Sequence, residues 1–203
     1  MRHDFTSQRL PGGFSWLNEP QAVAFAGGLA ITTKPRTDFW QRTHYGFRRD
    51  DGHCLLTGHA GDFSLETRVE FSPRTQYDQC GLMVRLDAEN WIKASVEYED
   101  AELSRLGSVV TSLGFSDWAT QDVSSTVRSL CHRISRTGSD FLLEWSADGH
   151  QWHQTRVAHL HALVAGGEEL QIGVYACSPL GDAFQCRFAY LDVGESRWRA
   201  GDS

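Results

Sequence analysis

Hydrophobic and polar residues alternate along much of the chain, most regularly between Tyr77 and Asp100. Successive side chains of a β-strand point to opposite faces, so alternation with a period of two predicts a strand with one buried face. The stretch Asp87-Ala88-Glu89-Asn90 between two such arms is typical of a turn. We therefore predict a hairpin whose buried face carries the apolar set Leu82, Val84, Leu86, Ile92, Ala94, Val96 and Tyr98.

The opposite face of the same hairpin is mostly polar. It presents a group of charged and hydrogen-bonding side chains, namely Gln79, Arg85, Lys93, Glu97 and Glu99. Such a display on a sheet whose other face is buried predicts a binding surface. Its chemistry does not name the ligand.

The rest of the chain continues the β pattern. Further strands are predicted around residues 29–33, 61–71, 106–111, 126–135, 141–146, 151–157, 170–177 and 184–193. The Asp148-Gly149 pair between two of these segments is a strong hairpin signal. Only in Ala158–Ala165 does a helix compete with a strand. Many short strands separated by turn residues indicate an all-β protein made of two packed antiparallel sheets.

Two polar, aromatic segments supply further candidate ligand contacts. If residues 38–45 are extended, Trp40, Arg42 and His44 share one side of the strand. Residues 114–122 (GFSDWATQD) are predicted to form a loop, in which Asp117 and Trp118 face a ligand. A tryptophan ring suits the C–H face of a sugar, although core packing is the commoner role of tryptophan in a sandwich.

Composition excludes some classes of function. The 203 residues carry 19 basic and 26 acidic side chains, a net charge of −7, which argues against non-specific nucleic-acid binding. No stretch approaches the roughly 18 apolar residues of a membrane span, and the first residues lack the apolar run of a signal peptide. We expect one domain over residues 1–203, with a frayed tail from about residue 195, and no nucleic-acid or membrane partner.

Cysteine and histidine spacing predicts neither a disulfide scaffold nor a metal site. The five cysteines are scattered and form no Cys-x-x-Cys pair, so buried free thiols in a reducing cytoplasm are expected. His159 and His161 would share a strand face, but no acidic or cysteine partner follows at a recognisable spacing. We expect no metal and no cofactor.

Several segments resemble a known family, namely DFWQRTHYGF (38–47), GDFSLETRVEF (61–71), YDQCGLMVRLDAENWIKASVEYED (77–100), LGSVVTSLGFSDW (106–118), FLLEWSADGHQWHQTRVAHL (141–160) and GVYACSP (173–179). Together they are similar to the regulation-of-enolase-like family of concanavalin A-like domains. That resemblance implies a jelly-roll sandwich with one concave sheet. Relatives by fold include lectins, carbohydrate-binding modules and glycoside hydrolases, so the resemblance alone implies no reaction.

Two interpretations of the acidic residues stay open at this point. Glu97 and Glu99 lie two residues apart on one strand face, roughly 6–7 Å by strand rise, which is within the spacing of glycosidase carboxylates. With Glu102 they loosely follow the Glu-x-Asp-x-x-Glu order of laminarinase-like hydrolases of this fold. The alternative is a structural ladder of ion pairs across the hairpin, with Arg85 and Lys93 as the partners of the carboxylates.

The sequence as a whole predicts a non-enzymatic binding domain. Its ligand would be a carbohydrate or a small polar or phosphorylated metabolite bound on the concave sheet. The predicted contacts are Trp40, Arg42, His44, Gln79, Arg85, Lys93, Glu97, Glu99, Asp117 and Trp118. The alternatives are a glycoside hydrolase or lyase that uses Glu97 and Glu99, and a protein-interaction regulator of a glycolytic enzyme.

Overall fold

The protein was analysed as a computed structural model, which describes residues 1–164 and 168–198. Its described residues form antiparallel strands and no helix, so none could cross a membrane as a long apolar helix. Sheet A has the order β15 (His153–His159), β14 (Asp140–Ser146), β13 (Ser129–Thr137), β8 (Phe63–Ser72), β17 (Gln185–Gly194), β4 (Leu29–Thr32) and β3 (Ala22–Phe25), and β1 (Arg2–His3) also pairs with β17. The all-β sandwich predicted from the sequence is confirmed.

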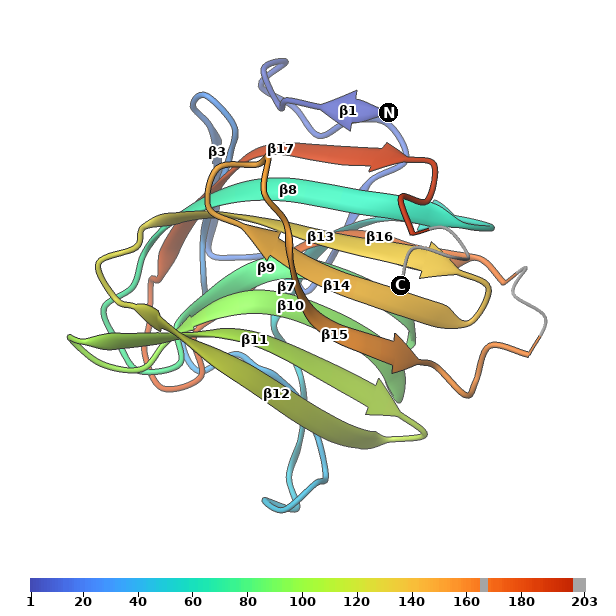
Figure 1. The fold of residues 1–203 in the computed structure, drawn as a ribbon. Coiled ribbons are helices and arrows are strands. Elements are labelled where there is room, and N and C mark those ends of the chain that lie inside the picture. The colour runs from blue at the N-terminus through green and yellow to red at the C-terminus, as the bar shows by residue number, and fades with distance from the viewer. Residues whose placement is uncertain (165–167, 199–203) are drawn as a thin grey trace.

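Sheet B packs against sheet A (Figure 1). Its order is β12 (Phe115–Ser124), β11 (Leu103–Ser112), β10 (Asn90–Tyr98), β9 (Gln79–Asp87), β16 (Leu170–Cys177), β7 (His53–His59) and β2 (Ser15–Leu17). The predicted hairpin is β9–β10, with its tight turn after Asp87, and it lies near the centre of this sheet. Because both its neighbours are paired strands, the hairpin is held in a fixed register.

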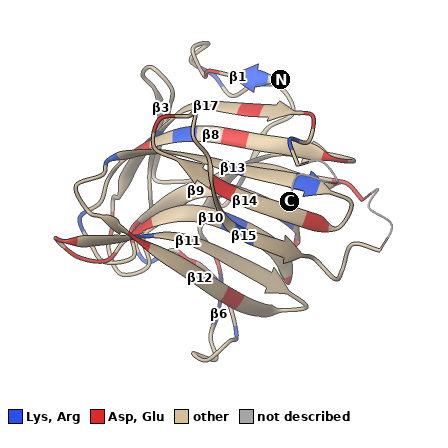
Figure 2. Cartoon of the chain, in the orientation of Figure 1, with Lys and Arg blue, Asp and Glu red and all other residues tan. Residues whose placement is uncertain are grey.

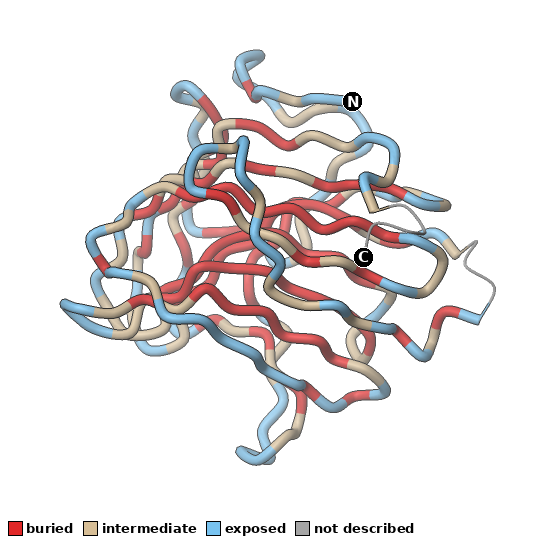
Figure 3. Tube along the Cα trace, viewed as in Figure 1, coloured by how far each residue is buried: buried red, intermediate tan, exposed pale blue. Residues whose placement is uncertain are grey.

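The core lies between the two sheets, where the apolar faces meet (Figure 3). Leu82, Val84 and Ile92 from sheet B are fully buried, as are Leu65 and Ile134 from sheet A. The register pairs Ile92 with Val84 and Ala94 with Leu82, so the alternation in the sequence corresponds to one continuous apolar face. Acidic and basic positions are interspersed on the strands of sheet A and in the loops (Figure 2).

A second apolar cluster lies on the outer face of sheet B. The strands β5 (Phe39–Gln41) and β6 (Arg48–Asp50) form a small hairpin that packs on this face. Phe39 is fully buried there, edge-on to Trp91 at 6.0 Å and to Tyr175 at 6.3 Å between ring centroids. The outer face of sheet B is therefore partly covered by the chain itself, which leaves a cleft beside the covered part.

Residues 38–45 do not form one extended strand, so the condition under which Trp40, Arg42 and His44 would share one side is not met. Strand β5 ends at Gln41, and the residues that follow form a turn in which Arg42 and His44 have φ values of 55° and 60°. This left-handed backbone interrupts the alternation. Trp40, Arg42 and His44 therefore do not lie on one strand face.

The prediction that residues 114–122 form a loop is wrong. Residues 115–122 belong to β12, which pairs with β11 along its full length and follows a tight turn at Leu113-Gly114, where φ is 51° and 78°. Strand β12 is the edge of sheet B and is exposed along most of its length (Figure 3). A strand that is solvated on both faces has a polar composition, which resembles that of a loop.

Two further predictions fall partly outside the described residues. The segment Ala158–Ala165 begins with the end of strand β15 and continues as a turn, so its described part contains no helix. Residue 165 is not described. The expected frayed tail begins at about residue 195, and its residues 199–203 are likewise not described. Residues 195–198 are bonded to sheet A, since Arg197 N donates to Ser64 Oγ at 2.7 Å and Thr137 Oγ1 donates to Trp198 O at 3.0 Å.

Candidate binding cleft

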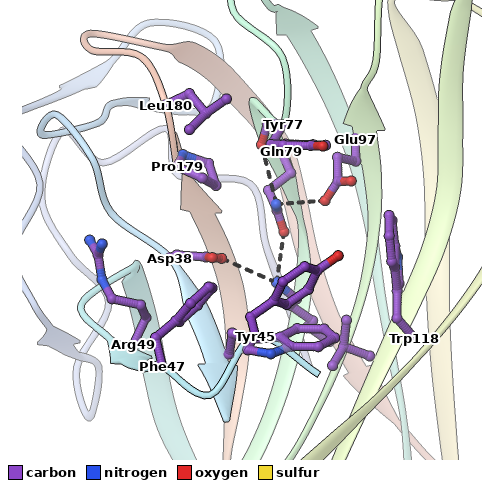
Figure 4. A pocket seen from close by; sticks show the side chains of 13 residues that line it. Asp38, Tyr45, Phe47, Arg49, Tyr77, Gln79, Glu97, Trp118, Pro179 and Leu180 are labelled. Atoms are coloured by element: carbon purple, nitrogen blue, oxygen red, sulfur yellow. Dashed lines mark hydrogen bonds and ion pairs between the residues drawn. The ribbon is translucent and has the colours of Figure 1, made fainter. Parts of the chain in front are cut away.

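A cleft of about 470 Å³ opens on the outer face of sheet B, beside the β5–β6 hairpin. Its floor comes from β9 and β10, and its walls come from β5, β6 and the turn between them, from β12, and from the segment after β16. The residues that line it are Asp38, Trp40, Tyr45, Phe47, Arg49, Tyr77, Gln79, Lys93, Glu97, Val109, Trp118, Pro179 and Leu180. In Figure 4, Trp118 lies on one side of the cleft, and Phe47, Pro179 and Leu180 lie on the other.

The floor is a chain of buried polar groups. Lys93 Nζ donates to Gln79 Oε1 at 2.8 Å, and Gln79 Nε2 donates to Glu97 Oε2 at 2.7 Å. Lys93, Gln79 and Glu97 are only 3%, 2% and 8% exposed. Alternation places them on the same face of the β9–β10 hairpin, where Gln79 is directly opposite Glu97. A buried ammonium and a buried carboxylate are thus joined through one amide.

The chemistry of its two neighbours sets the orientation of the Gln79 amide. A lysine ammonium can only donate and an ionised carboxylate can only accept, so the amide oxygen must face Lys93 and the amide nitrogen must face Glu97. Tyr175 OH donates to the same oxygen at 3.1 Å, and the nitrogen also donates to Tyr77 O at 3.2 Å. The amide is therefore fully bonded and rigidly held.

Glu97 has an unusual environment for a carboxyl group. Burial raises its pKa from 4.5 to about 7, and the positive charge of Lys93 opposes that rise. Only Oε2 is bonded to Gln79. The other oxygen, Oε1, has no hydrogen-bond partner among the described residues and is not enclosed by protein, so it is open to the cleft.

Aromatic side chains form most of the walls. Tyr45, Phe47 and Trp118 are 58%, 44% and 39% exposed, far above the usual value for such rings in a folded protein. Tyr45 stacks on Phe47 with ring centroids 5.7 Å apart and lies edge-on to Trp40 at 5.6 Å. The rings of the turn thus support one another, while Trp118 stands alone on the opposite wall. The cleft offers apolar flat faces above a polar floor.

The structure brings half of the predicted contacts together in this cleft. Trp40, Gln79, Lys93, Glu97 and Trp118 all line it. They were predicted from two segments far apart in sequence and from the polar face of one hairpin. Their shared cleft is a geometric finding, and their contact with a ligand stays a prediction.

The other predicted contacts lie outside the cleft lining and have different partners. Arg42 bonds to Glu89 Oε1 at 2.9 Å and to Gly114 O at 2.7 Å, and His44 packs edge-on against Tyr45. Asp117 pairs with Arg156 at 2.9 Å on the exposed edge of sheet B. The residues Arg42, His44 and Asp117 therefore hold the rim in place.

Arg85 and Glu99 contradict the predicted ion-pair ladder. Both guanidinium nitrogens of Arg85 bond to Asp50 at 2.8 Å, and Glu99 accepts hydrogen bonds from Arg105 at 3.0 Å and from Gln76 at 2.6 Å. Asp50 comes from β6 of the hairpin that packs on sheet B, and Arg105 comes from the neighbouring strand β11, so the charges of the β9–β10 hairpin find partners beyond it. Glu99 does not line the cleft, so Glu97 and Glu99 do not flank a common cavity.

Sequence reasoning missed several lining residues. They are Asp38, Tyr45, Phe47, Arg49, Tyr77, Val109, Pro179 and Leu180. The density of aromatic residues in the segment 38–47 was a signal for Tyr45 and Phe47, and the wrong strand assignment placed Tyr45 on the opposite side. Pro179 and Leu180 carried no signal, because only the tertiary structure brings the segment after β16 to the cleft.

Metal-ligating side chains do not gather in the part of the chain that the structure describes. No group of three or more His, Cys, Asp or Glu residues there is arranged to hold an ion. The rings of His159 and His161 are 4.8 Å apart, and His159 Nδ1 lies 2.6 Å from Asp140 Oδ1. All five cysteines, each within the described ranges, are buried free thiols.

Comparison with known proteins bears out the resemblance seen in the sequence. Residues 16–196 match the family model described as "Protein of unknown function (DUF1349)". The chain is 35% identical over 166 residues to "Regulation of enolase protein 1" from Saccharomyces cerevisiae, a match that covers 81% of each chain. A crystal structure of a functionally unknown protein from the same yeast superposes with a TM-score of 0.83 at 31% identity, over 92% of this chain and 98% of that one.

More distant solved structures share the fold alone. The glycoside hydrolase family 43 protein BlXynB from Bacillus licheniformis matches with a TM-score of 0.76 at 15% identity, over 96% of this chain and 39% of that one. The carbohydrate-binding module CBM66 from Bacillus subtilis matches with a TM-score of 0.56 at 14% identity, over 90% and 96%. Identities this low carry no function across.

Proposed function

We propose that this chain, which belongs to the DUF1349 family, is a non-enzymatic binding domain that holds a carbohydrate or small polar metabolite in the cleft on sheet B. One observation carries the proposal. A buried chain of polar groups, Lys93–Gln79–Glu97, ends in a carboxyl oxygen that is open to a cleft walled by exposed aromatic rings.

The physical chemistry of this arrangement supports ligand binding over a structural role. Burying a carboxyl group is unfavourable unless its hydrogen bonds are complete, and Glu97 has an open oxygen and a raised pKa. Perturbed titratable groups in clefts are concentrated at functional sites. Large exposed rings are also unfavourable in water, and Tyr45, Phe47 and Trp118 border the same space.

The volume and lining of the cleft suit a ligand with both polar and apolar faces. Small-molecule sites are concave, mostly apolar and supplied with a few placed polar groups, within about 300–1,000 Å³. The cleft of about 470 Å³ fits this description. A sugar presents C–H faces to aromatic rings and hydroxyl groups to the floor. The sandwich fold shared with the module CBM66 is consistent with this class of ligand.

A ligand screen with matched variants tests the proposal. The protein would be titrated with mono- and oligosaccharides, sugar phosphates and glycolytic intermediates, and its thermal stability recorded. A ligand at a hundred times its dissociation constant stabilises the folded state by about 2.7 kcal/mol, a readily measured shift. Trp118→Ala should abolish the shift. Trp152→Ala, which removes a tryptophan stacked under Arg133 at 4.0 Å and outside the cleft, should preserve it.

The outcomes of that screen are distinct. A shift that survives Trp118→Ala would place the ligand elsewhere and refute the cleft as its site. Release of reducing sugar from an oligosaccharide hit would replace the binding proposal with the hydrolase alternative. If no compound shifts the melting temperature, the binding proposal fails.

A second candidate function is regulation of a partner protein, and the exposed aromatic rim favours it. Tyr45, Phe47 and Leu180 are each more than 40% exposed around the mouth of the cleft. The yeast relative carries a name that refers to regulation of enolase. This candidate predicts that the purified chain binds purified enolase and changes its activity. Phe47→Asp should abolish both effects, while Val157→Asp, at a similarly exposed position on β15, should leave them intact.

We further propose that the protein binds its ligand in the cytoplasm. All five cysteines lie in the described ranges as buried free thiols, a pattern that suits a reducing compartment.

A further inference from the structure

The cleft contains a buried lysine whose ammonium group is bonded to the protein itself. An ammonium group has three N–H donors. Lys93 Nζ lies 2.8 Å from Gln79 Oε1, 3.2 Å from Phe39 O and 3.8 Å from Asp38 Oδ1. The first two contacts are hydrogen bonds and the third is an ion pair. The residue is only 3% exposed, so its ammonium group is held among these protein acceptors.

The amide of Gln79 is used in the same way. Its nitrogen donates to Glu97 Oε2 and to Tyr77 O, and its oxygen accepts from Lys93 and from Tyr175 OH. An amide group offers two donors and two acceptor sites, and all four are occupied. The Gln79 amide therefore has no N–H group left for an incoming ligand, and the Lys93 ammonium is directed at Gln79, Phe39 O and Asp38.

The open charged atoms of the floor are acceptors. Glu97 Oε1 has no partner among the described residues, as noted above. Asp38 accepts from its neighbouring backbone N–H and pairs with Lys93 through Oδ1, while its Oδ2 has no described partner and is not enclosed. Figure 4 shows Asp38 and Glu97 on the same cleft, with Gln79 between them. A ligand that reaches this floor meets two carboxyl oxygens.

The remaining cation of the lining does not offset these carboxylates. Arg49 bonds to both oxygens of Asp51 through Nε, at 3.2 Å each, and its Nη2 donates to Asp51 at 2.8 Å and to the carbonyl oxygen of Arg36. Its guanidinium points away from Gln79 and Glu97 (Figure 4). Among the described lining residues, the charges that face the floor are those of Lys93, Asp38 and Glu97, so the two carboxyl groups outnumber the one ammonium group.

We infer that, given the binding function proposed above, the ligand is a neutral polyhydroxylated ring whose hydroxyl groups donate to Glu97 and Asp38, and that the cleft rejects phosphorylated metabolites. Hydrogen bonds from a hydroxyl group to a carboxylate are charge-assisted and short. A phosphate would bring negative charge beside two carboxyl groups, while the one cation of the floor, Lys93, is buried and already paired with Asp38. The C–H faces of the ring pack against Trp118 and Tyr45, which are the exposed flat surfaces of the walls.

The substitution Glu97→Gln tests this inference sharply. The new side chain accepts from Gln79 through its amide oxygen and thereby turns its NH₂ group toward the cleft, which converts an acceptor into a donor. Loss of one charge-assisted hydrogen bond weakens binding about 10- to 100-fold. Glu99→Gln, the same change two residues along the chain and outside the cleft, is the matched control.

The experiment measures dissociation constants calorimetrically for glucose, xylose and their disaccharides, for glucose 6-phosphate, and for glucosamine and choline. The expected result is that a neutral sugar binds wild type and Glu99→Gln equally, binds Glu97→Gln about 10- to 100-fold more weakly, and binds more tightly than its phosphate. If Glu97→Gln does not fold, Asp38→Asn takes its place, because its Oδ2 is the other open acceptor and the residue is less buried.

Failure of this inference is separable from failure of the binding function. Tighter binding of glucose 6-phosphate than of glucose would overturn the inference while leaving the cleft as a binding site. Preference for glucosamine or choline would overturn the neutral ring in favour of an organic cation. If no probe binds, the binding function itself is refuted and the inference with it.

Discussion

The raised pKa of Glu97 has a measurable consequence for folding stability. Burial raises this pKa from 4.5, the ordinary value that the unfolded chain should show, to about 7. The folded state thus holds the proton more tightly than the unfolded state. Stability from this group is fully present below pH 4.5 and is lost as the pH rises through about 7. At about 1.4 kcal/mol per pKa unit, the loss is about 3 kcal/mol.

Glu97→Gln isolates that contribution, because glutamine resembles the protonated acid in shape and does not titrate. The free energies of unfolding of wild type and variant, measured in urea from pH 4.5 to 8, should diverge as the pH rises. The free energy of unfolding of the variant should rise relative to that of wild type by up to about 3 kcal/mol as the pH rises. All other titrating groups are shared, so their contributions cancel in the difference. Glu99→Gln reports the effect of removing a nearby carboxylate.

The reasoning fails if the difference between Glu97→Gln and wild type stays constant over this range within about 0.5 kcal/mol. A difference that moves in the opposite direction, with wild type gaining at high pH, would mean that attraction between Glu97 and Lys93 outweighs burial. In either case Glu97 would be a structural member of a satisfied polar chain.

Three further predictions concern the stability of the elements around the cleft, and each is tested by urea denaturation. Phe39→Ala should destabilise the fold by about 3–5 kcal/mol, because the ring is fully buried on sheet B. Phe47→Ala, on the same hairpin but 44% exposed, should change stability by less than about 1 kcal/mol. Equal effects of the two substitutions would contradict the anchoring role of Phe39. Arg85→Ala should lower stability by about 2–4 kcal/mol, since the arginine is buried against Asp50. A double-mutant cycle with Asp50→Ala should show a coupling energy above about 1 kcal/mol. Additive effects would refute a stabilising ion pair between Arg85 and Asp50. Leu113→Asn should raise stability by about 0.5–1 kcal/mol, because the exposed leucine has φ of 51° and asparagine tolerates this conformation better; a loss of stability would show that the leucine side chain contributes packing.

Hydrophobic alternation was a sound guide to the centre of the fold. The β9–β10 hairpin has the predicted turn and the predicted apolar face, because side chains that point into the core must be apolar at alternate positions whatever the neighbouring strands are. The burial of its polar face as well was not predicted. Strand β12 escaped detection for the complementary reason. At an edge that is solvated on both faces, nothing requires apolar residues at alternate positions, so GFSDWATQD has the composition of a loop.

Only those site residues that share one face of a single strand or hairpin could be predicted from the sequence. The polar face of one hairpin identified Gln79, Lys93 and Glu97, because residues two or four apart on a strand share a face. The partners that give them their properties come from far along the chain. Asp38 and Phe39 reach Lys93 across more than fifty residues, and Tyr175 reaches Gln79 across ninety-six.

The amino-acid pattern by itself determined that this chain forms antiparallel strands, which face of each central strand is buried, and that the β9–β10 hairpin displays polar groups. Tertiary structure alone decided that the β5–β6 hairpin packs on sheet B, that Arg85 and Glu99 turn to Asp50 and Arg105, and that Glu97 keeps one oxygen open. The physical reason is the sequence distance over which each kind of interaction acts. Alternation is a property of neighbouring residues, whereas the partners of a buried charge are chosen among all groups that packing brings within hydrogen-bonding distance.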